Sequence, residues 1–170
     1  MDEFTLDRFM LDAHNLMQDQ PPWPRNGQSW FGSIAWKQPR STNRVGLQVL
    51  VTSDQDIQRH LWPTSFEIEF LSERRRPLNT ERRWLAQHNA ITCQMIPFEH
   101  SVSSQENFNR FRVLSWLVLN ENVYVVGKGA LAGEQVKRMF LLFPVKGDGS
   151  SLAAVVFPET GVPELPPSRR

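Results

Sequence analysis

The chain has 170 residues, a formal net charge of +1 and 40% hydrophobic residues, which is enough apolar material for one globular domain with its own core. Its single cysteine excludes an internal disulfide, and no cysteine pair is present to hold zinc. No apolar run reaches the roughly 20 residues that cross a bilayer, and the N-terminus lacks a signal-peptide pattern. We therefore expect a cytosolic or nuclear protein with no membrane partner.

The charges are distributed unevenly along the chain. Residues 1–27 contain five acidic and two basic side chains, whereas residues 28–147 contain ten acidic and fifteen basic ones. An acidic arm thus precedes a basic body. Such an asymmetry gives information about partners rather than about fold.

Residues 1–20 are predicted to form an acidic amphipathic helix. Its apolar side chains recur at helical spacing over residues 3–18, at Leu6, Phe9, Met10, Ala13, Leu16 and Met17. Two interpretations remain open. The stripe could pack against the domain, or the segment could mimic the acidic, apolar peptides that the basic body would bind. Prolines at 21, 22 and 24 predict a stiff linker over residues 21–27.

The folded domain is predicted over residues 28–160. It opens with the strand Trp30–Trp36, whose alternation turns both tryptophans to one face. A second alternating strand over residues 45–52 is expected to pair with it. After Trp62-Pro63, a third strand over residues 64–71 is expected, with Phe66, Ile68 and Phe70 inward and Glu67 and Glu69 outward.

The second half of this domain mixes helices with further strands. The patterns predict a helix over 79–88, a strand over 90–98, a helix to about Leu119 that Ser103 or Ser104 caps, and strands over 123–126, 136–145 and 151–157. Glu106 could complete a capping box with Ser103, and the helix stripe is Phe108, Phe111, Leu114 and Val118. Glycines at 127, 129 and 133 are expected to interrupt the fifth strand. From Pro158 onward the chain is expected to leave the fold, with a proline-rich tail over 161–170. We predict an α+β fold in which helices flank a seven-stranded, mostly antiparallel β-barrel.

No pattern in the chain is typical of catalysis. The glycine-rich stretch over 127–133 lacks the ending of a phosphate-binding loop, and the four histidines lack metal-ligand spacing. Cys93 lies mid-strand among apolar residues, which favours a buried structural thiol. The arginine run Arg74–Arg76 is interpreted as a solvated loop, so direct nucleic-acid binding is not favoured. We expect a binding module with no catalytic residue, metal or cofactor.

Three motifs in this order resemble the activator-interaction (PTOV) domain of Mediator complex subunit 25, a relative of the SPOC barrels. The first is the opening strand, Trp30-x-Gly32-x-Ile34-x-Trp36. The second is the Leu47–Val51 strand followed by Trp62-Pro63 and the alternating Phe66, Ile68 and Phe70. The third is the closing hairpin, residues 136–143 and 152–157, followed by Pro158. The resemblance covers roughly residues 28–160.

The resemblance implies a nuclear, non-enzymatic docking domain of a transcriptional coactivator. Its expected partners are acidic transactivation domains of transcription factors and other Mediator subunits. The electrostatic contacts are predicted at Arg44, Arg110, Arg112, Lys128, Lys137 and Arg138, with Lys137 falling where the family's sixth strand also carries a basic residue. The chain departs from the family at its end, because the family closes with a helix and Gly161–Arg170 is proline-rich. The N-terminal helix could occupy that place.

The alternative function is a SPOC-type reader of phosphorylated peptides, in which clustered arginine and lysine side chains bind phosphate groups. The two hypotheses differ in the chemistry that the ligand must carry.

Overall fold

The structure is a computed structural model that describes residues 28–38, 41–76, 81–99 and 104–165. Its elements are β1 (Ser29–Lys37), β2 (Arg44–Thr52), a 3-10 turn (Arg59–Leu61), β3 (Ser65–Arg74), α2 (Arg82–Gln87), β4 (Ile91–Pro97), α3 (Ser104–Glu121), β5 (Val123–Gly129), β6 (Lys137–Pro144) and β7 (Leu152–Val156). The predicted acidic helix over 1–20, the linker over 21–27 and Ser103 lie outside these ranges.

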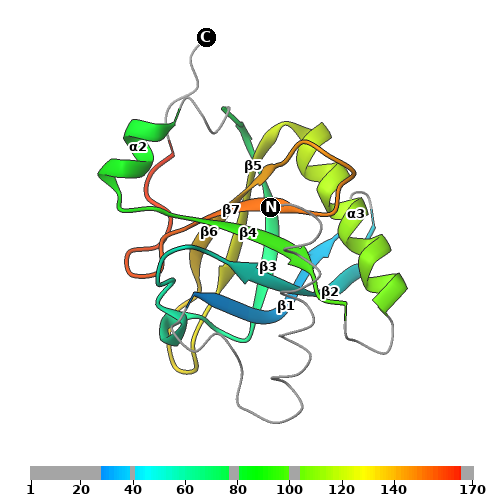
Figure 1. Cartoon of the computed structure of the whole chain (residues 1–170), viewed down its shortest axis with the longest axis horizontal. Coiled ribbons are helices and arrows are strands. Elements are labelled where there is room, and N and C mark those ends of the chain that lie inside the picture. The colour runs from blue at the N-terminus through cyan, green and yellow to red at the C-terminus, as the bar shows by residue number, and fades with distance from the viewer. Residues whose placement is uncertain (1–27, 39–40, 77–80, 100–103, 166–170) are drawn as a thin grey trace.

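The seven strands close into a barrel in the order β1-β2-β4-β7-β6-β5-β3. Every neighbouring pair is antiparallel except β1 and β3, which run parallel through four registered residue pairs. Figure 1 shows α2 and α3 on opposite sides of this barrel. The predicted seven-stranded, mostly antiparallel barrel with flanking helices is therefore confirmed.

The opening strand supplies part of the barrel core, as predicted. Trp30, Ile34 and Trp36 are buried, and the Trp30 indole donates a hydrogen bond to the Pro63 carbonyl at 3.0 Å. Its ring lies over Gly32, where an added Cβ would be only 2.1 Å from the ring. Gly32 is therefore required by close packing within its own strand.

Aromatic side chains from three strands and from Trp62, which follows the 3-10 turn, meet inside the barrel. Trp30 contacts Trp62 at 5.3 Å between ring centroids and Phe66 at 5.2 Å, and Phe66 contacts Phe140 at 4.9 Å. From one side, α3 adds Phe111, Leu114, Leu117 and Val118 to the same cluster. The helix therefore forms part of the barrel core and is not a surface addition.

Asn107 of α3 bonds to the backbone at the end of the pairing between β2 and β4. The last registered pair of β2 and β4 is Val49 with Pro97. Beyond it, the Asn107 amide donates to the carbonyls of Gln48 and Phe98, at 2.8 and 3.0 Å, and its oxygen accepts from the Gln48 N–H at 2.7 Å. The Phe98 N–H also donates to the Gln48 carbonyl at 3.0 Å, so this one buried side chain reinforces the end of the strand pairing and fixes α3 to it.

A second apolar cluster lies outside the barrel wall, beneath α2. Trp84 and Leu85 pack there against Phe157 and Tyr124, whereas Arg82 and Arg83 are exposed, as predicted. The expectation that the chain leaves the fold at Pro158 is wrong, because the Val162 N–H donates to the Arg138 carbonyl at 2.7 Å and Leu165 packs on this cluster. Residues 166–170 of the predicted tail lie outside the described ranges.

Strand β5 also differs from its prediction. It runs through Gly127 to Gly129, with a shift of register against β6 at Lys128. A Cβ on Gly127 would lie 2.0 Å from the Phe140 ring. This glycine therefore allows a core aromatic side chain to approach the backbone and does not interrupt the strand.

Candidate functional site

Helix α3 combines a buried face with an apolar exposed face. Phe111, Leu114 and Val118 are buried as predicted, whereas Phe108 is only half-buried and Asn107 takes a buried position. The helix ends where Asn122 adopts a left-handed conformation, with φ of 54°, which asparagine tolerates well. Glu106 pairs with Arg110 one turn later.

The outward face of α3 exposes three large apolar side chains. Val113 is 48% exposed, Trp116 61% and Leu119 57%, and they follow one another at a spacing of three residues. Val145, in the connection between β6 and β7, is 43% exposed and faces the same groove. Large apolar side chains gathered on a surface are typical of interaction sites.

These side chains line a groove of about 510 Å³ between α3 and the β6–β7 connection, which we call the α3 groove. Its lining comprises Arg112, Val113, Ser115, Trp116, Leu119, Pro144, Val145, Gly147, Asp148, Gly149, Ser151 and Leu152. The Ser115 hydroxyl donates to the Gly149 carbonyl at 3.0 Å and ties the helix to the connection. The groove is therefore built from two elements that are fixed to each other.

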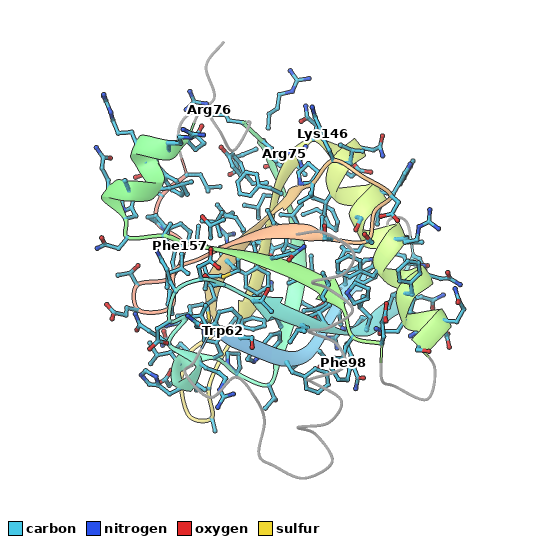
Figure 2. The ribbon with its side chains drawn as sticks, viewed as in Figure 1. Trp62, Arg75, Arg76, Phe98, Lys146 and Phe157 are labelled. Atoms are coloured by element: carbon cyan, nitrogen blue, oxygen red, sulfur yellow. The ribbon has the colours of Figure 1, made fainter. Side chains whose placement is uncertain are left out.

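Both signs of charge occur at the edge of the α3 groove. The Arg112 guanidinium lies 6.0 Å from the centroid of the Phe108 ring, and the exposed Lys146 follows Val145 in the same connection (Figure 2). Hydrogen bonds from Ser150 hold the pKa of Asp148 below its usual value. One cation and one carboxylate thus line the groove, and a second cation, Lys146, lies next to it in the sequence.

The structure brings together three of the predicted basic residues on another part of the barrel. Arg44 pairs with Glu67, and Glu69 receives Lys128 at 2.6 Å and Arg138 at 3.8 Å. The hydrogen bond from Lys128 lowers the pKa of Glu69. Glu67 and Glu69, the outward residues of β3, therefore neutralise much of the expected basic surface.

The other predicted basic residues have separate positions. Lys137 donates to the Pro158 carbonyl at 3.0 Å, and Arg110 donates to the Gly46 carbonyl at 2.8 Å. Of the six predicted residues, Arg112 is the one that lines the α3 groove. Whether any of the six contacts a ligand stays a prediction.

The arginine run at the end of β3 is more than a solvated loop. Arg75 donates to the Val118 carbonyl of α3, and burial lowers its pKa. Arg76 pairs with the buried Glu81 at 3.1 Å, and Figure 2 shows both arginines near the same end of the barrel. Two of the three arginines therefore hold helices in place.

Sequence reasoning missed the apolar residues of the α3 groove. Val113, Trp116 and Leu119 were available as a second apolar row on the predicted helix, displaced from the stripe that contains Phe111. A helix with two apolar faces is a signal that one of them contacts something other than its own core.

The described residues offer no arrangement typical of a metal site. Within the described ranges, no three histidine, cysteine, aspartate or glutamate side chains gather where they could hold a metal ion. Burial raises the pKa of the Cys93 thiol to about 12. None of the described helices has the length and apolarity needed to span a bilayer.

Comparisons with known proteins give a structural likeness without a sequence relative. No protein-family model and no curated protein matches the chain. Among solved structures, the chain is similar to the SPOC domain of human PHD-finger protein 3, with 14% sequence identity and a TM-score of 0.44. The similarity covers 75% of this chain and 93% of that one.

Proposed function

We propose that this chain is a non-enzymatic protein-interaction domain that binds acidic amphipathic helices in the α3 groove. The observation that carries the proposal is the convergence of Val113, Trp116, Leu119 and Val145 on one groove. Amphipathic peptide helices bind such grooves by inserting apolar side chains at a spacing of three and four residues.

Charge favours an acidic ligand over a basic one. Arg112 and Asp148 both line the groove, and the exposed Lys146 is the next residue after Val145 of the lining. Arg112 and Lys146 would attract acidic side chains that lie beside the apolar anchors of a ligand. This attraction would mainly increase the rate of association. The basic excess over residues 28–147 acts in the same direction at longer range.

The biological setting that we propose comes from the sequence. The resemblance of the Trp30–Trp36 strand and the closing hairpin to the activator-interaction domain of Mediator complex subunit 25 supports a role as a nuclear transcriptional coactivator. The ligands would then be acidic transactivation domains of transcription factors, and other Mediator subunits would be further partners.

Titration with an acidic amphipathic peptide tests the proposal. We expect chemical-shift changes in NMR spectra at Val113, Trp116, Leu119 and Val145. Trp116→Ala should weaken binding at least about tenfold, because exposed aromatic anchors carry much of the energy of such interfaces. The matched control is Val136→Ala, which removes a side chain that is 65% exposed outside the groove and should leave affinity unchanged.

A phosphoserine peptide distinguishes the alternative function. A phosphate group would have to replace Glu69 as the partner of Lys128 and Arg138. Binding of the phosphorylated peptide alone, with shifts around these cations and none at Trp116, would contradict the proposal.

A further inference from the structure

The outer wall of the barrel carries an apolar row that is separate from the α3 groove. Trp30, Val51 and Met95 belong to the barrel core, so their neighbours Phe31, Leu50 and Ile96 point outward, because side chains alternate along a strand. The strand register places Phe31 opposite Leu50 and Leu50 opposite Ile96. Phe98 extends the row, with its ring centroid 4.2 Å from that of Phe31.

Three of the four residues of this outer row are buried, and Phe31 is half-buried. Leu50 is 0% exposed, Ile96 5% and Phe98 1%. The row belongs neither to the barrel core cluster nor to the cluster beneath α2. An outward-facing residue in a barrel wall loses contact with water only where a further segment covers it.

The chain that precedes β1 begins beside this row. Gln28, directly before β1, accepts a hydrogen bond from the Ser53 N–H at 2.9 Å through its carbonyl, and Phe31 follows three residues later. The seven residues of the linker over 21–27 can span up to about 23 Å, whereas three adjacent strands are only about 10 Å across.

The chemistry of the N-terminal arm fits the outer row. Residues 3–18 have an apolar stripe that a helix of about 24 Å would present along one side. The outward residues that flank the row on its three strands are Ser33, Gln48, Thr52 and Gln94, which carry no charge that would repel the acidic arm.

We propose that residues 3–18 form a helix whose apolar stripe covers the row of Phe31, Leu50 and Ile96. The arm is then a structural part of the domain, and the α3 groove is left open. The exposure of each surface favours this assignment over occupation of the groove, because Leu50 is fully buried while Trp116 is 61% exposed. The proposal stands independently of the proposed function.

A nitroxide spin label on the arm tests the proposal in the full chain. Asn15→Cys places the label on the polar side of the predicted helix, and buried Cys93, whose pKa is raised to about 12, does not compete for the reagent. We expect the methyl signals of Leu50 and Ile96 to broaden more than those of Leu119 and Val145. Stronger broadening at Leu119 and Val145, or no broadening at any of the four, would overturn the proposal.

A pair of variants checks that the apolar stripe makes the contact. Phe9→Asp, made in the labelled chain, should abolish the broadening at Leu50 and Ile96. Arg8→Asp introduces the same side chain on the polar side of the predicted helix and should preserve it. If both variants abolish the broadening, or if neither does, the apolar stripe does not make the contact. The peptide titration followed at Trp116 tests the proposed function, whereas the broadening at Leu50 and Ile96 tests the position of the arm. Either proposal can therefore fail without the other.

Discussion

At the scale of single residues, the most informative arrangement is the one around Glu69. This carboxylate lies between Lys128 and Arg138, at 2.6 and 3.8 Å. The three come from neighbouring strands β3, β5 and β6, so their side chains meet across the outer surface of the sheet. Cross-strand pairs of opposite charge stabilise a sheet modestly.

The lowered pKa of Glu69 predicts a pH-dependent contribution to stability. Because the pKa in the folded chain lies below the ordinary value of 4.5, the contribution is complete at neutral pH and is lost as the pH falls through the folded value. Glu69→Gln should lower the free energy of unfolding at pH 7 by less than about 1 kcal/mol, since the site is solvent-screened. Urea denaturation measures the difference, which should vanish in acid. A difference in the free energy of unfolding that persists in acid would show that the ionised Glu69 carboxylate is not its cause.

Single residues also mark what the sequence could not predict. The outward direction of Glu67 and Glu69 followed from strand alternation and is confirmed. Their partners did not follow, because Lys128 is 59 residues from Glu69 and meets it only through the register of β3 with β5. The sequence could not show that Arg44, Lys128 and Arg138 are paired, because their pairing with Glu67 and Glu69 depends on the order and register of the strands.

At the scale of elements, β5 shows how glycines within a strand can be mistaken for an interruption of that strand. The expected interruption rested on the glycines at 127, 129 and 133. In the structure, Gly127 stays in the strand because the Phe140 ring of β6 occupies the space where a side chain would lie. A sequence shows that glycine can adopt unusual backbone conformations. It does not show which neighbouring side chain needs the space that glycine leaves free.

This contact predicts different outcomes for two similar substitutions. Gly127→Ala would place a Cβ 2.0 Å from the Phe140 ring, so it should destabilise the domain by about 1–3 kcal/mol. Gly46→Ala is the matched control in β2, where the nearest atom to the added Cβ is 3.8 Å away, and should have little effect. Thermal or urea unfolding measures both. Equal losses of stability would show that the loss comes from replacing a strand glycine and not from the contact.

Helix α3 shows the same limit for the candidate site. Its inward stripe of Phe111, Leu114 and Val118 followed from helical periodicity and is confirmed. The exposed row of Val113, Trp116 and Leu119 has similar composition, and its exposure depends on where the β6–β7 connection lies. Periodicity cannot decide which of two apolar faces the protein itself covers.

At the scale of the whole molecule, the closed barrel should protect Cys93 from reaction. The thiol is 4% exposed in β4, which pairs with β2 on one side and β7 on the other. Burial raises its pKa to about 12, so almost no reactive thiolate is present at neutral pH.

We therefore expect a thiol reagent to label Cys93 only through unfolding of the barrel. The labelling rate should follow the unfolding rate at high reagent concentration. Faster unfolding caused by Gly127→Ala should then accelerate labelling in proportion. Labelling far faster than unfolding would reveal a local opening of β4.

The overall architecture was the part that sequence reasoning predicted best. Seven strand-like segments, beginning with the alternating Trp30–Trp36, and the lengths of their connections indicated a mostly antiparallel barrel flanked by helices, and the structure has that barrel. The path of the chain after Pro158 was not predictable, since the hydrogen bond from Val162 to Arg138 leaves no trace in composition.

The amide of Asn107 has a consequence for how such a domain could evolve. It links α3 to β2 and to Phe98, the residue after β4, through three hydrogen bonds to backbone groups. An aspartate could accept the one from the Gln48 N–H but could not donate the other two, and a leucine could make none of them. The apolar side chains at positions 113, 116 and 119 of the same helix are exposed and do not join the helix to the strands in this way. Substitutions there could change which partner is recognised while Asn107 preserves the joint, so recognition and architecture can be selected separately within one helix.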